Sequence, residues 1–378
     1  MKVVVDCLAY QHRKSLGYER YIFALLDCLY DNVRAIQSDD VLVAVRETER
    51  DRLARYATKL HIVPFGVKNV TDLFLVQNTF RWRLGLDDNS VILHTYNYGS
   101  LIKQARHILV IHDVQFRRFP QYWPKVKLIQ RRISVPRSID VATSVVTDSQ
   151  FTKNELIRLY SVRPEKLQVI YLECDRERLR PLGRVGAGGP PGWDLSEGYF
   201  LNVSSLAPHK NTVSLLQAFR RFLSLGKPMK LVLVGSRASL GAECSEFITQ
   251  SGIASYVVIT GDISDQTLAS LYEHCQAFIF PTQYEGFGYP IVEALSFDRP
   301  TFLSDIEICH EIGGVYATYF RPDDFDGLAS LMADVVRTPA AFTIHAKDEI
   351  AARFSRNATT LRYIDLINRV AAAAPSRC

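Results

Sequence analysis

The chain has 378 residues, of which 47% are hydrophobic and 22% charged, and its formal net charge is +5. This length favours two domains, and the composition is typical of packed globular proteins rather than of disordered chains. No apolar run is long enough to cross a bilayer, and the start MKVVVDCLAY lacks the pattern of a signal peptide. The cysteines are dispersed without a metal-binding spacing, which favours reduced thiols in a cytosol. The mild net charge does not indicate a nucleic-acid partner.

Short apolar runs separated by helical patterns fill the first half of the chain. We expect a buried strand that ends at Asp6, a helix at 21–30, and a helix at 152–160 with a capping box formed by Thr152 and Glu155. Further strands are expected at 41–45, 91–96, 107–113 and 144–149. Strands that alternate with helices predict parallel βαβ units.

The composition changes at residues 181–194, whose five glycines and three prolines are typical of a linker. After the linker the alternation restarts, with strands expected at 199–205, 230–235, 256–262, 277–282 and 300–305 and helices at 213–224, 265–275 and 290–297. We therefore predict an α/β chain of two doubly wound parallel-sheet domains, 1–182 and 195–356, joined by a linker at 183–194. The closing helix, 357–378, is expected to pack back on the first domain. Ligands of such sheets bind outside the carboxyl ends of the strands, so the cleft between the domains is the expected site.

A glycine-rich turn lies between two carboxylates in the second half. Glu285 precedes Gly286, Phe287 and Gly288, and Glu293 lies in the helix that follows. The glycines let the backbone approach a ligand closely, and a helix start presents free N–H groups to an anion. Carboxylates accept strong hydrogen bonds from sugar hydroxyls. An isolated pair of such acids is more often a helix cap and a solvated residue. As ligand-binding groups beside an anion site, the two acids would suit a ligand with both phosphates and hydroxyls.

The stretch EGFGYPIVEAL, residues 285–295, resembles the signature EGFGLPxxEAL of retaining GT-B glycosyltransferases of glycosyltransferase family 4. The resemblance extends over nearly the whole chain. It implies two Rossmann-like domains that face a central cleft. In that family the first glutamate contacts hydroxyls of the donor sugar and the second holds the ribose of the nucleotide. Glu285 and Glu293 match these two positions, and the turn 286–288 would line the donor site.

Two further segments of the second half carry the resemblance. Lys210 matches the lysine that contacts the donor diphosphate, whereas Ser205 stands where the family usually has an arginine. His209 or Arg237 would then compensate for that arginine, or Lys210 would hold the diphosphate alone. Ile263 belongs to a turn that lies against the base in the family.

In the first half, His112 and Asp113 resemble a His-Asp pair at a strand end, where the family's histidine lies near the transferred sugar and the acceptor. Asp113 would orient His112 or form a hydrogen bond toward the next helix. A single histidine is more often structural, but its position at a strand end favours a functional role. Gly17 opens a segment that resembles Gly-x-Gly-Arg-Tyr, a loop near the diphosphate and the acceptor, and Glu19 replaces the second glycine.

The resemblance implies a retaining, metal-independent transferase with no cofactor, which moves a hexose from a nucleoside-diphosphate sugar to a lipid-linked glycan acceptor. The expected catalytic residues are His112, Glu285 and Lys210. The first half resembles bacterial mannosyltransferases of O-antigen or exopolysaccharide synthesis, which suggests GDP-mannose. One alternative is a nucleotide-sugar epimerase of the same fold, which needs no acceptor. Another is a catalytically silent nucleotide- or glycan-binding subunit of a polysaccharide assembly complex, which the departures at Ser205 and Glu19 would suit.

Residues 116–137 combine basic, aromatic and aliphatic side chains, and no acidic residue occurs between Asp113 and Asp140. The basic residues are Arg117, Arg118, Lys125, Lys127, Arg131, Arg132 and Arg137. This pattern suits a solvated helix that packs on the first sheet, and equally a segment that binds an anionic membrane surface. The second interpretation predicts a cytoplasmic protein that is peripheral at the inner face of the plasma membrane.

Overall fold

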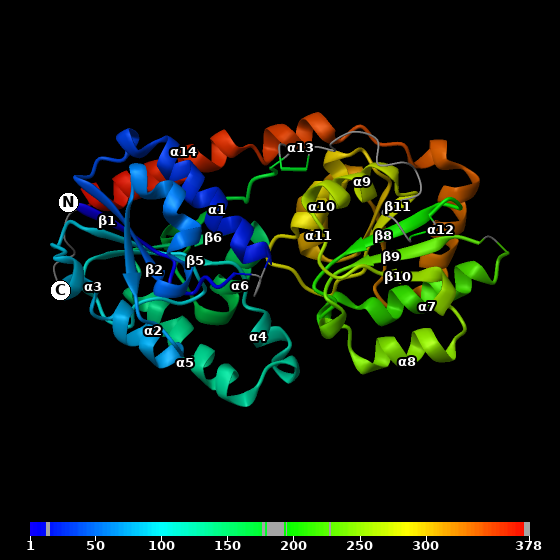
Figure 1. The fold of residues 1–378 in the computed structure, drawn as a ribbon, viewed down its shortest axis with the longest axis horizontal. Coiled ribbons are helices and arrows are strands. Elements are labelled where there is room, and N and C mark those ends of the chain that lie inside the picture. The colour runs from blue at the N-terminus through cyan, green and yellow to red at the C-terminus, as the bar shows by residue number, and fades with distance from the viewer. Residues whose placement is uncertain (13–15, 176–177, 180–192, 194, 227, 374–378) are drawn as a thin grey trace. The chain divides into compact units, whose positions relative to one another are not determined.

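The computed structural model describes residues 1–12, 16–175, 178–179, 193, 195–226 and 228–373. The chain folds into two compact units (Figure 1). Unit 1 comprises Met1–Glu173 and Arg356–Cys378, and unit 2 comprises Cys174–Ser355. The division thus falls earlier in the chain than the expected end of the first domain at 182. Of the linker expected at 183–194, only Trp193 is among the described residues.

The described residues of unit 1 form a seven-stranded sheet with the order β3-β2-β1-β4-β5-β6-β7, in which all pairings are parallel. The strands are β1 Lys2–Asp6, β2 Asp40–Arg46, β3 His61–Phe65, β4 Val91–His94, β5 Arg106–Ile111, β6 Ser144–Thr147 and β7 Leu167–Val169. The strand order changes direction between β1 and β4, which makes the sheet doubly wound, as predicted.

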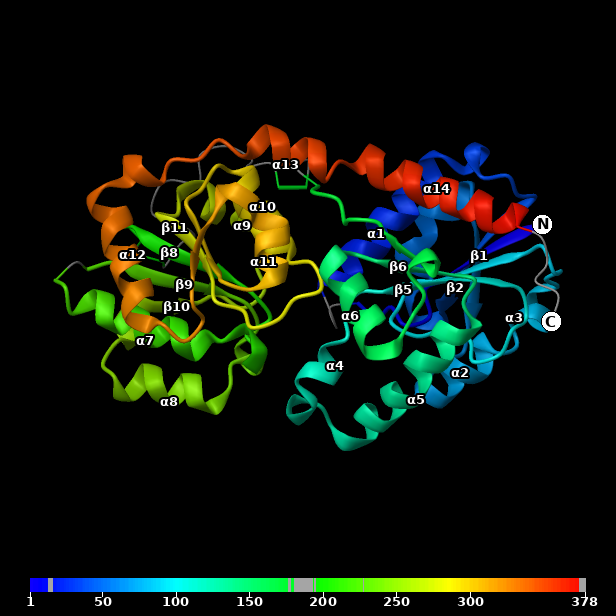
Figure 2. The ribbon, with the colours of Figure 1, turned by 180° about the vertical axis from the view of Figure 1, so that it is seen from behind.

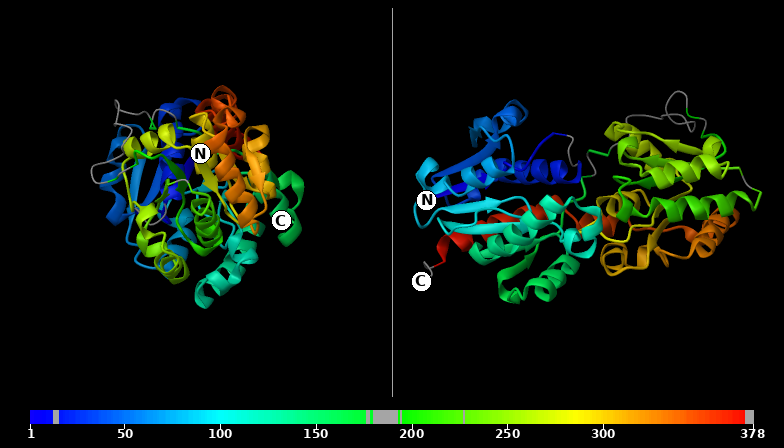
Figure 3. Two further views of the ribbon diagram at one scale, coloured as in Figure 1. Left: turned by 90° about the vertical axis from the view of Figure 1, so that its right-hand side faces the viewer. Right: turned by 90° about the horizontal axis from the view of Figure 1, so that it is seen from below.

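Helices cover both faces of this sheet, as Figures 1 and 2 show. They are α1 Leu16–Asp31, α2 Val70–Gln77, α3 Phe80–Leu84, α4 Gln115–Arg118, α5 Lys125–Val141, α6 Gln150–Tyr160 and α14 Arg356–Ala372. The last helix, α14, packs against α1, β4 and β5, and Figure 3 shows it in red beside the strands of unit 1. A bond of 3.1 Å joins the hydroxyls of Tyr21 on α1 and Tyr363 on α14. The end of the chain therefore returns to the unit in which the chain begins.

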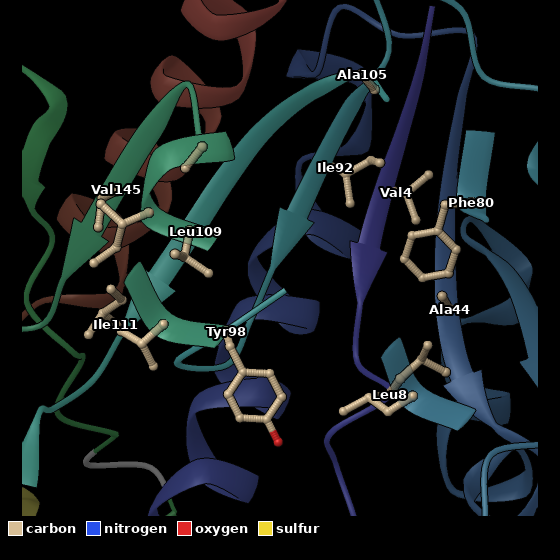
Figure 4. Packing of buried hydrophobic residues seen from close by; sticks show 14 of the residues in the cluster. Val4, Leu8, Ala44, Phe80, Ile92, Tyr98, Ala105, Leu109, Ile111 and Val145 are labelled. Carbon is tan, nitrogen blue, oxygen red and sulfur yellow. The ribbon is translucent and has the colours of Figure 1, made fainter. Parts of the chain in front are cut away.

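One core layer of unit 1 lies between the sheet and helices α2, α3 and α5. Val4, Ile92 and Leu109 are fully or almost fully buried, and their side chains point from neighbouring strands toward this layer (Figure 4). Phe80 of α3 and Val135 of α5 close it from the other side. Strands buried on both faces explain why the sequence shows continuous apolar runs rather than strict alternation.

Unit 2 repeats the same architecture. Its described residues form a six-stranded sheet of order β10-β9-β8-β11-β12-β13, with all strand pairings parallel. The strands are β8 Tyr199–Val203, β9 Lys230–Val234, β10 Val257–Ile259, β11 Ala277–Phe280, β12 Thr301–Ser304 and β13 Thr318–Phe320. The helices are α7 Thr212–Leu223, α8 Ala242–Gln250, α9 Asp265–His274, α10 Tyr289–Ser296, α11 Glu307–Gly313, α12 Phe325–Arg337 and α13 Lys347–Arg353. The order changes direction between β8 and β11, which are hydrogen-bonded neighbours.

The helix expected at 152–160 begins earlier, and the predicted capping box is wrong. Helix α6 starts at Gln150, and Ser149 caps it by accepting a hydrogen bond from the Thr152 backbone N–H at 3.0 Å. Glu155 is buried instead, and Arg118 donates to both of its carboxylate oxygens at 2.7 and 2.9 Å. The capping residue was missed because Ser149 completes an apolar run that reads as strand.

Candidate functional site

Lys210 and Glu285 meet at the point where the strand order of unit 2 reverses. Lys210 lies in the loop after β8, and Glu285 lies in the loop after β11. Lys210 Nζ is 2.5 Å from Glu285 Oε1, and both side chains are largely buried. In doubly wound sheets the ligand crevice forms at this reversal, outside the carboxyl ends of the strands. The sequence predicted that each of these residues follows a strand, and in the structure their two side chains are in contact.

The two loops are also joined through their backbones. The backbone N–H of Gln283 donates to the His209 carbonyl at 2.8 Å. Burial, together with the neighbouring charge of Lys210, lowers the pKa of the His209 imidazole to about 3. His209 is therefore neutral at physiological pH and cannot supply the positive charge of the missing arginine. Arg237 donates to the Ile259 carbonyl at 3.4 Å, and Ser205 is exposed. Of the candidates for the role of the missing arginine, Lys210 is therefore the cation that contacts Glu285.

The glycine-rich turn shapes the start of α10. Gly288 has φ +96°, a left-handed conformation, and a Cβ there would lie 3.0 Å from Ile291 Cδ1. No side chain caps the helix start, where the Ile291 backbone N–H donates to the Gly288 carbonyl at 2.9 Å. Phe287 is buried, with its ring centroid 5.5 Å from that of Phe354. Gly286 connects this turn to Glu285. The helix begins at Tyr289, one residue before the expected proline.

Glu293 is almost fully buried on α10 and already has two partners. Arg178 Nη2 lies 2.6 Å from its Oε1, and the Tyr272 hydroxyl donates to its Oε2 at 2.9 Å. Arg178 also pairs with Asp265. The sequence interpretation missed both Arg178 and Tyr272, because Arg178 is near the linker and Tyr272 reads as a core position of α9. Ile263 is half-buried in the turn between β10 and α9, the helix that carries Tyr272 and Asp265.

In unit 1, His112 directly follows β5 and is held from three sides. Its Nδ1 lies 2.6 Å from Asp148 Oδ2, and its Nε2 lies 3.0 Å from the Thr95 carbonyl oxygen. Its backbone N–H donates to Asn97 Oδ1 at 2.7 Å. Of the two alternatives for Asp113, the structure has the second: Asp113 accepts from the Gln115 backbone at the start of α4. The acid that orients His112 is Asp148, which lies after β6.

Burial lowers the pKa of His112, but the Asp148 carboxylate, the Thr95 carbonyl and Asp113 together outweigh this effect, so the net shift of the pKa is upward. Nearby, Gly17 is the second residue of α1, and a Cβ at this position would meet no atom within 4 Å. Glu19, which stands in place of a second glycine, accepts from the Tyr10 hydroxyl at 3.3 Å and lies 3.0 Å from His12 Nδ1. The glutamate therefore has partners within unit 1.

The basic segment of unit 1 divides into a buried and an exposed side. Arg131 is only 7% exposed, and its guanidinium lies over the ring of Trp123, 4.5 Å from the ring centroid. Its Nη2 donates to the Tyr96 hydroxyl at 2.8 Å, and the rings of Tyr98 and Phe116 complete the enclosure. The interpretation of Arg131 as a surface residue is therefore wrong. Its position on the inner face of α5 places it among aromatic side chains.

The outer side of α5 is apolar as well as basic. Val126, Ile129 and Ile133 are 80%, 59% and 64% exposed and follow helical spacing, so they form one stripe. Lys125, Lys127 and Arg132 are exposed beside it. Among the residues that the structure describes, we find no helix with both the length and the apolarity to span a bilayer.

The described ranges also contain no cluster of three or more His, Cys, Asp or Glu side chains arranged to hold a metal ion. Unit 2 instead holds two groups of paired charges, Lys210 with Glu285, and Arg178 with Glu293 and Asp265. Such a set can neutralise phosphate oxygens and accept hydrogen bonds from hydroxyls, which are the two features of a nucleotide sugar.

Two doubly wound parallel-sheet units are the architecture of the GT-B glycosyltransferase fold, and solved structures of this kind match the whole chain. Sucrose-phosphate synthase from Thermosynechococcus elongatus aligns over 99% of this chain and 100% of its own, with a TM-score of 0.76 and 15% identity. Alr3699/HepE of Anabaena, solved in complex with UDP and glucose, aligns over 98% and 100%, with a TM-score of 0.74 and 18% identity. At these identities the likeness establishes the fold, and the fold predicted from the sequence is confirmed.

Residues 190–360, slightly less than half of the chain, match the family described as glycosyl transferases group 1. The O-antigen chain mannosyltransferase B of Escherichia coli is 26% identical over 247 residues, which are 65% of each chain. RfbU, an O-antigen chain mannosyltransferase of Salmonella typhimurium, is 25% identical over 62% of each chain. WbdA, a serotype-specific mannosyltransferase of Escherichia coli, is 32% identical over 56% of this chain and 27% of its own. Each match spans less than two thirds of the relative's own length.

Proposed function

We propose that the protein is a retaining glycosyltransferase that transfers mannose from a nucleoside-diphosphate sugar to a lipid-linked glycan in bacterial O-antigen or exopolysaccharide synthesis. The observation that carries this proposal is the contact between Lys210 and Glu285 at the reversal of strand order in unit 2. A salt bridge with a purely structural role could form anywhere in the core. This pair instead lies in two loops that converge at the edge of the sheet where ligands bind. A donor with a negative diphosphate and a hydroxylated sugar needs both a cation and a hydrogen-bond acceptor there.

The donor would lie along unit 2 in a defined order. Glu293 would accept hydrogen bonds from the ribose, and Ile263 would lie against the base. Lys210 and the start of α10, at Gly288, would face the diphosphate. Glu285 would accept from sugar hydroxyls once the diphosphate engages Lys210, and Phe287 would keep the turn in place. Gly17 of unit 1 would allow the backbone close to the diphosphate.

We propose a front-face transfer that needs no metal ion. The bond between the sugar anomeric carbon and the diphosphate oxygen breaks, and the acceptor hydroxyl oxygen bonds to the same face of that carbon. Because the new bond forms on the face from which the diphosphate departs, the anomeric configuration is kept, and the hydroxyl proton passes to the departing diphosphate oxygen. Lys210 would stabilise the negative charge that grows on the diphosphate, which is where preorganised charge lowers a barrier most. Full activity in the presence of a chelator is the expected result.

Mannose is proposed as the sugar because the relatives reported above are named mannosyltransferases. GDP is proposed as the nucleotide with it. A ligand at one hundred times its dissociation constant stabilises a protein by about 2.7 kcal/mol. Thermal unfolding is therefore measured with saturating GDP, UDP or ADP in separate samples. GDP should raise the melting temperature clearly, and UDP and ADP should not.

The lipid-linked acceptor would be reached through the outer side of α5 within the segment 116–137. We propose that Val126, Ile129 and Ile133 enter the headgroup region of an anionic membrane while the neighbouring lysines attract its charge. Aliphatic side chains gain by leaving water, and each basic residue near an anionic surface contributes about 1 kcal/mol. The protein would then be cytoplasmic and peripheral at the inner face of the plasma membrane.

The experiment that tests the function is product analysis. The protein is incubated with GDP-mannose and lipid-linked glycans from a bacterium that makes a mannose-containing polysaccharide, and the product linkage is determined by NMR. Formation of an α-mannosyl product from the α-linked donor supports a retaining transferase. A β-linked product would disprove retention, and modification of the donor sugar without an acceptor would identify an epimerase. Donor binding without any turnover would identify a silent binding subunit.

A further inference from the structure

His112 is surrounded by hydrogen-bond acceptors. Asp148 Oδ2 lies 2.6 Å from one ring nitrogen, and the Thr95 carbonyl oxygen lies 3.0 Å from the other. A neutral imidazole has one N–H donor and one lone pair, so it can satisfy only one of these two oxygens. The other oxygen would then face a lone pair. Only the doubly protonated ring donates to both.

The surroundings of Asp148 reinforce this requirement. Its carboxylate is 2% exposed, and its second oxygen, Oδ1, has no hydrogen-bond partner among the described residues. A buried carboxylate without compensation is costly, and removing the only opposite charge beside it is strongly destabilising. His112 is the one ion-pair partner that the described part of the chain provides for Asp148.

The ring of His112 is also fixed in orientation. The ring centroids of Tyr21 and Tyr18, both on α1, lie 4.6 and 5.7 Å from it at steep angles. The Tyr18 hydroxyl bonds to Thr95 Oγ1 at 2.8 Å, which holds the segment that supplies the carbonyl. The Asp113 carboxylate lies next in the chain and adds a weaker negative potential. Among the described residues, the titratable groups that contact the ring or shift its pKa are Tyr18, Tyr21, Asp113 and Asp148.

We propose that Asp148, with the Thr95 carbonyl, holds His112 as a permanent imidazolium, and that Asp148 is a positioning residue for this cation. The ring then has no lone pair with which to take a proton from an acceptor hydroxyl. With both N–H groups directed at Asp148 and Thr95, His112 would act as a fixed positive charge in unit 1 rather than as a general base. This protonation state follows from the geometry alone, whereas its effect on transfer rests on the proposed function.

The assignment is consistent with the upward shift of the His112 pKa, which opposes the effect of burial. Replacing Asp148 by Asn keeps the size of the side chain and removes the charge. Burial would then dominate, and His112 would become neutral at physiological pH. The neighbouring Asp113 offers a matched control, since it contacts the α4 backbone and not the imidazole.

Two-bond proton–nitrogen NMR of histidine-labelled protein distinguishes the two states without any activity measurement. An imidazolium shows two similar, protonated nitrogen shifts, whereas a neutral ring shows one protonated and one unprotonated shift. His112→Gln identifies the resonance among the nine histidines. We expect an imidazolium at about pH 7.5 in the wild type and in Asp113→Asn, and a neutral ring in Asp148→Asn.

A neutral His112 in the wild type at that pH would overturn the proposal, and the wild-type titration needs no variant that might fail to fold. An imidazolium that persists in Asp148→Asn would remove Asp148 from the assignment. In transfer assays, loss of this charge-assisted bond should lower kcat at pH 7.5 by about tenfold or more. The alkaline decline of kcat should begin at lower pH in Asp148→Asn than in Asp113→Asn. If the protein transfers no sugar, the NMR result still decides the protonation state.

Discussion

Arg178 Nη2 lies 2.6 Å from Oε1 of Glu293, the buried carboxylate that we assign to the ribose of the donor. The Tyr272 hydroxyl donates a hydrogen bond to Oε2 of Glu293 at 2.9 Å. A carboxylate oxygen accepts more than one hydrogen bond, so ribose hydroxyls can add to these partners rather than replace them. Arg178 and Tyr272 therefore orient the carboxylate, and Glu293 should lose its function when its charge is removed.

Glu293→Gln should weaken nucleoside-diphosphate binding by about 1.5–3 kcal/mol, because hydrogen bonds to a charged acceptor contribute this much. The loss should be similar for GDP and for GDP-mannose, since both carry the ribose. Isothermal titration calorimetry measures both affinities. Tyr272→Phe is the matched control, because it removes one donor to Glu293 and keeps the carboxylate. Unchanged GDP affinity in a folded Glu293→Gln protein would disprove the ribose assignment.

Glu285 and Lys210 should separate kinetically although they are paired in the structure. Glu285→Ala should reduce transfer and spare the binding of free GDP, because the sugar is the proposed ligand of Glu285 in the donor complex and free GDP carries none. Lys210→Ala should lower kcat more than it raises the donor KM, since charge on the diphosphate grows in the transition state. Steady-state kinetics and GDP titrations of both variants test this division. Equal loss of GDP affinity in the two variants would contradict it.

The outer stripe of α5 should carry membrane binding. Replacing Val126, Ile129 and Ile133 with serine should weaken partition into vesicles rich in phosphatidylglycerol by at least about tenfold, because each aliphatic side chain gains 1 kcal/mol or more on leaving water. Binding should also fall as salt is raised. Leu361→Ser on α14, where the leucine is 66% exposed, is the matched control. Equal sedimentation of the triple variant and the control would contradict the proposed surface.

Arg131 and Arg132 are neighbours in sequence with opposite roles. Arg131→Gln should destabilise the protein by about 2–4 kcal/mol, because it removes a guanidinium packed against four aromatic rings and leaves polar atoms buried. Arg132→Gln should change the free energy of unfolding by less than about 0.5 kcal/mol, as is usual for exposed positions. Urea unfolding of the two variants measures the difference. Equal destabilisation would show that the aromatic enclosure contributes no stability.

His209 should make the protein sensitive to acid. Its pKa in the folded state is lowered to about 3 by burial and by Lys210, whereas an unfolded histidine titrates near 6.5. Its contribution to stability is complete above pH 6.5 and is lost as the pH falls toward the folded value, by at most about 1.4 kcal/mol per pH unit. His209→Asn should therefore lose less stability than the wild type between pH 7 and pH 5 in urea unfolding. Parallel losses in the two proteins would contradict the neutral buried state.

Apolar patterning and turn residues predicted most of the fold. Strand runs such as VVVD and AFIF were identified because both faces of each sheet are covered, which leaves uninterrupted apolar segments. The strands β3, with His61 and Pro64, and β13, with Tyr319, were missed. Both are edge strands, where partial exposure permits polar residues and proline. The cap of α6 at Ser149 was missed because a strand, a cap and a helix follow one another without a break.

The candidate site was predictable where local pattern defines it and not where distant residues meet. Glu285, Gly288 and Glu293 belong to one segment, so a single motif indicated them. Arg178 reaches Glu293 from a remote part of the chain, and Asp148 reaches His112 from another strand end. Such pairs depend on strand order, which the sequence pattern did not specify. Arg131 lies four residues before the apolar Val135, so helical spacing could have predicted that it faces inward. The many basic residues around it favoured an exposed position instead.

The most direct test of the account is the rate of GDP release from GDP-mannose, measured with and without a lipid-linked glycan acceptor, in the wild type and in Lys210→Ala. The account predicts fast release by the wild type that depends on the acceptor, and a rate at least about tenfold lower in Lys210→Ala, since charge on the departing diphosphate would lose its partner. Release that is the same with and without acceptor, or the same in the two proteins, would contradict the proposed transfer at the site where Lys210 meets Glu285.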